Sequence, residues 1–189
     1  MLIMLSNFSY GGPVMQAIVN RRKNYHLSGS QLSRQSIQTL LEAGMRISLK
    51  DEADRWSFVV IQDEGYIRYL REYGDLLSIL DGKVDGSQDV TLNSGGVGSL
   101  ILVCANLTIP FYLDHCWLAV ENMLLTGSAL GYGISLDGSL LKVLNLSTIK
   151  GELNIPETLA VLAILLVGEP ESPHLPISNY APKVWKWLS

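Results

Sequence analysis

The segment from Phe111 to Gly131 constrains this chain most, because its apolar residues lie almost all the way round a helix. Asp114 can cap the start of that helix, and Gly131 can end it. A helix that is apolar on most sides must be covered on most sides, and a chain of 189 residues has few other elements to cover it. We therefore expect a second copy of the chain to supply part of the cover.

Composition narrows the class of protein. With 48% hydrophobic and 17% charged residues, the chain is too apolar to be disordered, and its length suits one domain. A formal net charge of −4 gives no general electrostatic reason to bind nucleic acid. The longest apolar run, Leu159 to Val167, is much shorter than the roughly 20 residues of a membrane-spanning helix, so we expect no membrane partner. Cys104 and Cys116 form no CxxC motif, which favours a reduced, cytoplasmic location.

The remaining apolar patterns predict a mixture of helices and strands. Helices are expected from Pro13 into a basic cluster, from Gln31 to Arg46, from a cap at Asp63 to about Tyr73 with Gly74 as the stop, and over one or two turns in 147–153. Strands are expected at Trp56–Ile61, Leu100–Ala105 and Leu159–Val167, with a short extended piece after Gly133 and a glycine-rich loop over 81–98. Because helices do not alternate strictly with strands, the order favours α+β over a doubly wound sheet.

The basic triplet Arg21-Arg22-Lys23 ends the first expected helix and has two interpretations. Cations are favoured at helix C-termini, so the triplet can simply complement the helix dipole. Guanidinium groups also match phosphate oxygens in pairs, so the triplet can instead be a phosphate clamp.

No side-chain group with obvious catalytic or metal-binding chemistry follows from the sequence. The histidines at 26, 115 and 174 have no second histidine at metal-ligand spacing. Asp114, His115 and Cys116 are consecutive, so on a helix they point in different directions and form no triad. The glycines of 95–98 lack the lysine of a P-loop and precede a strand. We expect no metal and no catalytic side chain; if the protein is an enzyme, a cofactor performs the chemistry.

Four stretches, in this order, carry a resemblance to a known family: AIVNRRKNYHL, LLEAGMRISLKDEADRWSFVVI, DHCWLAVENMLLTGSALGYG and LNIPETLAVLAILLVGEP. The first ends a helix in an Arg-Arg pair, the second places a Trp at the start of an apolar strand, and the last two are the more specific. Together they resemble the nitroreductase family, the FMN-dependent NAD(P)H oxidoreductases.

This resemblance implies a single domain over 1–189, an α+β sandwich around a mixed, mainly antiparallel sheet. It implies a homodimer, with the long helix in the interface and the tail, 170–189, packing on the partner subunit. FMN would lie between the subunits and pass reducing equivalents from NAD(P)H to a small electrophilic acceptor, such as a nitroaromatic or a quinone.

The resemblance also assigns cofactor-binding residues. Arg21, Arg22, Lys23 and Lys183 fall where the family binds the flavin phosphate and ribityl chain, and Ser135, Leu136, Asp137 and Gly138 fall where backbone groups approach the flavin ring. Glu52 and Asp54 stand where the family has Asn and Gln beside the flavin. Two carboxylates beside an anionic cofactor are unfavourable unless paired. This change favours the alternative, a non-catalytic dimeric protein of the same fold that binds a flavin or another small ligand and has lost reductase activity.

Overall fold

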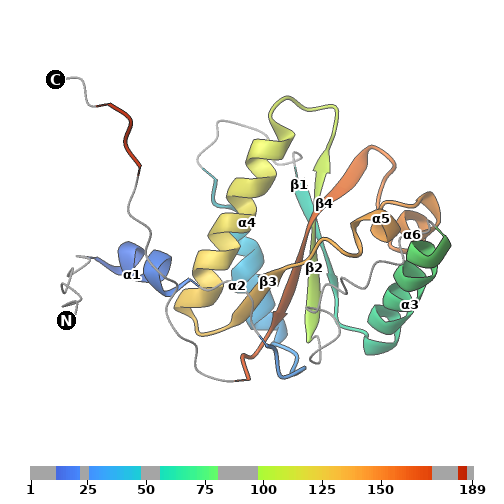
Figure 1. Ribbon diagram of the computed structural model, residues 1–189, viewed down its shortest axis with the longest axis horizontal. Coiled ribbons are helices and arrows are strands. Elements are labelled where there is room, and N and C mark those ends of the chain that lie inside the picture. Colours follow the sequence, from blue (N-terminus) through green and yellow to red (C-terminus); the bar gives the residue numbers. More distant parts are fainter. Residues whose placement is uncertain (1–11, 22–25, 48–55, 81–97, 172–182, 187–189) are drawn as a thin grey trace.

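A four-stranded antiparallel sheet forms the centre of the protein (Figure 1). The structure is a computed structural model that describes residues 12–21, 26–47, 56–80, 98–171 and 183–186. The strands are β1 (Trp56–Ile61), β2 (Ser99–Asn106), β3 (Gly133–Leu136) and β4 (Leu159–Gly168), in the order β1-β2-β4-β3. Every pairing among them is antiparallel, where the resemblance implied a mixed, mainly antiparallel sheet.

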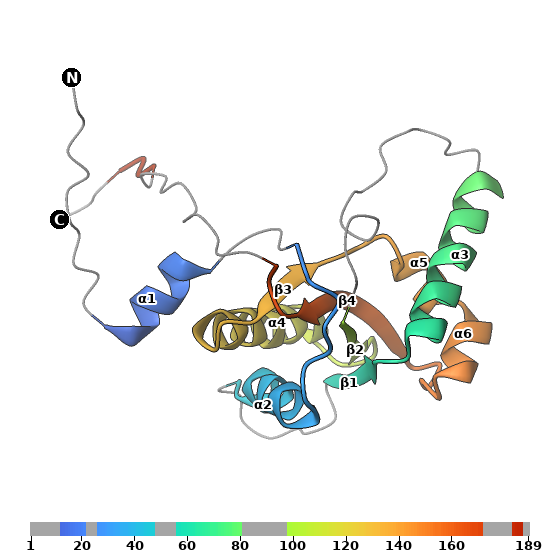
Figure 2. The ribbon, with the colours of Figure 1, turned by 90° about the horizontal axis from the view of Figure 1, so that it is seen from below.

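Helices cover both faces of this sheet (Figures 1 and 2). The described helices are α1 (Pro13–Asn20), which contacts α4 and lies away from the sheet, α2 (Arg34–Met45), α3 (Glu64–Leu80), α4 (Tyr112–Ala129), α5 (Leu141–Leu144) and α6 (Ser147–Glu152). Helices α2 and α4 lie on one face, and α3, α5 and α6 lie on the other. The predicted α+β class is confirmed, and so are the strands and most of the helices; the short helix α5 was not anticipated.

The central strand β2 explains why two helical layers are needed. Its residues from Leu100 to Ala105 are fully buried. Because neighbouring strand residues point to opposite faces, Leu100, Leu102 and Cys104 join the core under α3, α5 and α6. The alternate residues, Ile101, Val103 and Ala105, join the core under α2 and α4.

Helix α4 buries one face against the sheet and exposes the opposite one. Gly127 allows the closest approach, since a Cβ at this position would clash with Ile134 of β3. The apolar side chains that remain exposed on and beside α4 are Phe111, Leu113, Trp117, Leu118 and Leu130. One expectation was wrong: the residue that starts this helix is Phe111, in the left-handed conformation with φ of 60°, and Asp114 lies within the first turn without capping it. Gly131, with φ of 81°, follows the end of the helix as expected.

Helix α3 begins as expected but continues past its predicted end. Asp63 Oδ1 accepts a hydrogen bond from the backbone N–H of Tyr66 at 2.6 Å, the geometry of a helix cap. Gly74 does not stop the helix, which runs on to Leu80. An added Cβ at Gly74 would lie 3.2 Å from Leu140 Cδ2, so the glycine permits close packing against the region of α5. Tertiary packing thus outweighs the local tendency of glycine to end a helix.

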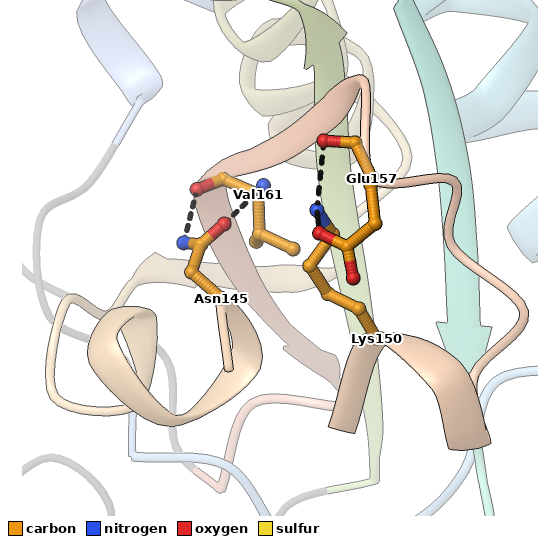
Figure 3. A network of polar contacts seen from close by, with 4 residues as sticks. All are labelled: Asn145, Lys150, Glu157 and Val161. Atoms are coloured by element: carbon orange, nitrogen blue, oxygen red, sulfur yellow. Dashed lines mark hydrogen bonds and ion pairs between the residues drawn. The ribbon is translucent and has the colours of Figure 1, made fainter. Parts of the chain in front are cut away.

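Polar side chains complete β4 where β3 does not reach it (Figure 3). Strand β3 pairs only with residues 165–168 of β4. Asn145 therefore takes the place of a neighbouring strand: its amide donates to Val161 O at 2.9 Å, and its Oδ1 accepts from Val161 N at 2.9 Å. Nearby, the buried ammonium of Lys150 donates to the carbonyl and the carboxylate of Glu157, in the turn before β4.

We expect the Asn145→Ala variant to lose about 2–3 kcal/mol of unfolding free energy, because it removes two hydrogen bonds from the backbone of a central strand. Urea denaturation measures the change. Asn122→Ala is the control, since Asn122 makes one side-chain bond, to Arg46 O, and we expect it to cost less than about 1 kcal/mol. Equal losses for the two variants would show that Asn145 does not support β4.

Candidate functional site

Arg21 is the C-cap residue of α1, and its side chain links α1 to α4. Its backbone N–H donates to Ala17 O at 2.9 Å, and its guanidinium forms an ion pair with Glu121 of α4. The Arg21 side chain is 39% exposed, and its other N–H groups can donate hydrogen bonds to an anionic ligand. Its place at a helix C-terminus fits the dipole interpretation equally well. Arg22 and Lys23 lie outside the described residues.

Strand β3 presents a row of backbone polar groups at the edge of the sheet. Among the described residues, β3 pairs with β4 on one side and has no strand on the other. The backbone N–H of Asp137, just after β3, donates inward to Ile164 O at 3.0 Å. Because backbone groups alternate in direction along an extended segment, the N–H and C=O of Leu136 point to the open edge. The backbone groups at an edge of this kind can donate hydrogen bonds to a planar heterocycle and accept hydrogen bonds from it.

The turn that follows β3 contains a buried carboxylate. Asp137 is only 7% exposed, and Ser135 is likewise buried, whereas Leu136 is exposed. Asp137 Oδ1 accepts a hydrogen bond from the backbone N–H of Ser139 at 2.6 Å, which fixes the turn from Asp137 to Leu140. Its Oδ2 atom is buried with no hydrogen-bond partner among the described residues. Gly138 lies in the same turn, and its carbonyl accepts from Leu141 N.

Arg71 lies on α3, the helix that packs against the end of this turn at Leu140. Its Nε and Nη2 atoms are buried and have no hydrogen-bond partner in the described part of the chain. Burial lowers the pKa of Arg71, while the carboxylates of Asp137 and Asp75 act in the opposite direction. Sequence reasoning missed Arg71, although its position four residues after the buried Ile67 places it on the inner face of α3.

Three of the expected site residues remain to be placed: Glu52, Asp54 and Lys183. Glu52 and Asp54 lie outside the described residues. Lys183 belongs to the short tail segment 183–186, which lies beyond the sheet on the same side as α1 (Figures 1 and 2). Its ammonium lies 4.3 Å from the centre of the Trp185 ring, a cation–π contact on a residue that is 87% exposed.

The cysteines are poor nucleophiles. Burial raises the pKa of Cys104 to about 11 and that of Cys116 to about 12, so neither forms the reactive thiolate near neutral pH. His115 and Cys116 are buried on α4, where the His115 ring lies 6.1 Å from that of Trp56.

Within the described ranges, no three of the residues His, Cys, Asp and Glu gather as metal ligands. In the same ranges, no helix is both long and apolar enough to cross a membrane.

These described residues fit FMN in three respects. The edge of β3 offers backbone donors and acceptors to a flavin ring, and Arg21 offers an accessible cation to its phosphate. The buried Asp137 Oδ2 leaves hydrogen-bonding capacity beside that edge. When bound, FMN would supply hydride and electron transfer, and the chain would supply binding, orientation and exclusion of water.

Comparison with known proteins identifies this arrangement of helices and strands. No protein-family model matches the sequence. The chain is 24% identical over 165 residues to an Archaeoglobus fulgidus protein named "Putative NADH dehydrogenase/NAD(P)H nitroreductase", covering 83% of this chain and 85% of that protein.

Solved structures match over most of the chain. An FMN-dependent nitroreductase from Clostridium difficile R20291 matches with a TM-score of 0.76 at 17% identity, covering 92% of this chain and 98% of that one. A nitroreductase with bound FMN from Bacteroides fragilis matches with a TM-score of 0.73 at 17% identity, covering 92% and 96%. The chain therefore has the nitroreductase fold, and the resemblance to that family is confirmed.

We expect both cysteines to resist a thiol reagent such as DTNB in the native protein at about pH 8, because burial holds them as neutral thiols. Both should react at once in denaturant. Rapid labelling of the native protein would instead show that Cys104 or Cys116 is accessible and ionised, and would reopen the question of a cysteine nucleophile.

Proposed function

We propose that this protein is an FMN-dependent oxidoreductase that transfers reducing equivalents from NAD(P)H to a small electrophilic acceptor, of the nitroaromatic or quinone type. The observation that carries the proposal is the open edge of β3 at Leu136, in a fold shared with nitroreductases that hold FMN. The free, buried cysteines agree with a cytoplasmic location.

The roles of the residues follow from their chemistry. Arg21, Arg22, Lys23 and Lys183 hold the phosphate and ribityl chain through charge-assisted hydrogen bonds. Backbone groups of 135–138 orient the flavin ring, and the apolar residues around them exclude water. Glu52 and Asp54 lie near the ring, where neighbouring cations must balance their charge.

We also propose that the protein is a homodimer through α4. In the single chain, Trp117 and Leu118 are 45% and 50% exposed, on a helix whose other face is fully covered. Val14, Met15 and Ile18 of the neighbouring α1 extend this apolar surface. The chain folds as one domain, with the tail 170–189 packing on the partner subunit. Burying the apolar surface of α4 and α1 is favourable by about 25 cal/mol per Å² of apolar area. Exposed apolar patches of this kind mark interaction sites.

The alternative is a dimeric protein of the same fold that binds a small ligand or a flavin without catalysis. Two observations favour it: the carboxylates at positions 52 and 54 in the sequence, and the ion pair that already engages Arg21 with Glu121. A colourless protein that ignores added FMN would support this alternative.

The proposal is tested by the visible spectrum of the purified protein and by FMN titration of its variants. We expect a yellow protein, and we expect Arg21→Ala to weaken FMN binding by about 2 kcal/mol, roughly 30-fold, because it removes a charge-assisted hydrogen bond. Glu121→Gln should tighten FMN binding, since it frees Arg21 from its carboxylate partner.

The control for this titration is Arg34→Ala, which removes an exposed arginine at the start of α2. We expect its affinity to match that of the unmodified protein. An unchanged affinity in Arg21→Ala would remove Arg21 from the site, and no binding by the unmodified protein would reject FMN as the cofactor.

For the dimer, we expect Trp117→Glu to give a monomer at micromolar concentration, because a carboxylate is costly to bury in an apolar interface. Light scattering measures the mass. Leu76→Glu is the matched control on α3, where Leu76 is 53% exposed outside the proposed interface, and should remain dimeric. A monomeric unmodified protein would contradict the proposal.

A further inference from the structure

Helix α1 depends on α4 to stay in place. It has eight residues, Pro13–Asn20, and a helix of that length is only marginally stable by itself in water. It lies away from the sheet and packs on α4 (Figure 2). Its apolar side chains Val14 and Ile18 remain exposed in the single chain. The contacts that join α1 to α4 therefore decide whether α1 is ordered.

The ion pair between Arg21 and Glu121 is a polar contact between the C-terminal end of α1 and the middle of α4. Both carboxylate oxygens of Glu121 accept from the same nitrogen of the guanidinium, Nη1. The strongest contacts of a guanidinium with an anion use two nitrogens in a parallel fork. A phosphate can therefore bind Arg21 with better geometry than Glu121 does.

The setting of this pair allows its partners to exchange. Glu121 lies four residues after Trp117, so both side chains lie on the exposed face of α4. The side chains of Arg21 and Glu121 are both partly exposed. An ion pair between groups of this kind changes an equilibrium by at most about fivefold. An incoming anion can displace Glu121 from Arg21 at that small cost.

We propose that Glu121 stands in for the phosphate of the ligand: it pairs with Arg21 in the ligand-free protein, and the phosphate takes over that pairing when the ligand binds. The inference rests on the proposed function, in which Arg21 binds the phosphate of FMN. Glu121 is then a specificity-determining residue, because it competes only with ligands that place an anion at Arg21. It also keeps α1 docked on α4 before the ligand binds.

This exchange makes Glu121 matter differently for two flavins. Riboflavin has no phosphate, so it leaves the ion pair in place and its affinity does not depend on Glu121. FMN must displace Glu121, so Glu121 lowers the preference of the site for FMN over riboflavin. In both states an anion balances the charge of Arg21, and α1 remains docked.

The test compares Glu121→Gln with the unmodified full-length protein. We expect the variant to bind FMN about two- to fivefold more tightly and riboflavin with unchanged affinity, as measured by titration. In the flavin-free protein, we expect the backbone amides of α1 to exchange their hydrogens about two- to fivefold faster in the variant. FMN should restore their protection, and riboflavin should not. A merely structural defect would not distinguish the two flavins.

Two further variants act as controls. Asp114→Asn removes the same charge from α4 two turns earlier, and should leave the ratio of FMN to riboflavin affinity and the exchange of α1 unchanged. The double variant Arg21→Ala with Glu121→Gln shows whether Glu121 acts through Arg21. We expect it to bind FMN no more tightly than Arg21→Ala alone, because the competition requires the guanidinium.

The outcomes separate this inference from the function on which it rests. An unchanged ratio of affinities in Glu121→Gln, or unchanged exchange of α1 in its flavin-free form, would overturn the inference. Equal tightening with and without Arg21 would also overturn it, because Glu121 would then act on the phosphate directly. Each of these results leaves the proposed function intact. Failure of the unmodified protein to bind FMN would overturn both.

Discussion

Burial of both faces of β2 and β4 is the constraint from which the remaining structure follows. Apolar strands of this kind need a helical layer on each side, and α2 with α4 and α3 with α5 and α6 provide the two layers. The sheet can cover only one face of α4, although that helix carries apolar residues on nearly every side. The surface that the sheet leaves uncovered, around Trp117, is the physical reason to expect a partner subunit.

The unequal lengths of β3 and β4 create the candidate site. Strand β3 covers only the last part of β4, so the rest of β4 is completed by the backbone N–H of Asp137 and by the side chain of Asn145. Each satisfies backbone groups that a longer β3 would have paired. The consequence is a short edge strand that is paired on one side and has no neighbouring strand on the other within the described part of the chain.

Much of the fold could be predicted from the sequence, because long apolar runs decide their own structure. The strand Trp56–Ile61 was predicted to the residue, and β2 and β4 to within one residue at their ends. One error fell where a tertiary contact outweighs local preference: Gly74 lies within α3 and packs close to Leu140. A second error was the cap of α4, where Phe111 takes the position assigned to Asp114. A phosphate clamp at Arg21, Arg22 and Lys23 was one of two interpretations drawn from the residues themselves, and the other site residues were predicted through family resemblance. Arg71 was missed because its burial depends on packing near the turn after β3, which lies more than 60 residues away in the chain.

Arg21 and Arg71 differ in how their charges are balanced. Arg21 and Glu121 are both about two-fifths exposed, and an ion pair in that setting contributes roughly 0–1 kcal/mol. Arg21 can therefore exchange its carboxylate for a phosphate with little loss. The Nε and Nη2 atoms of Arg71 are buried without a hydrogen-bond partner among the described residues, which is costly for a charged group. The fold thus distinguishes Arg21, an accessible cation that already has a carboxylate partner, from Arg71, a cation with buried atoms that no described group satisfies.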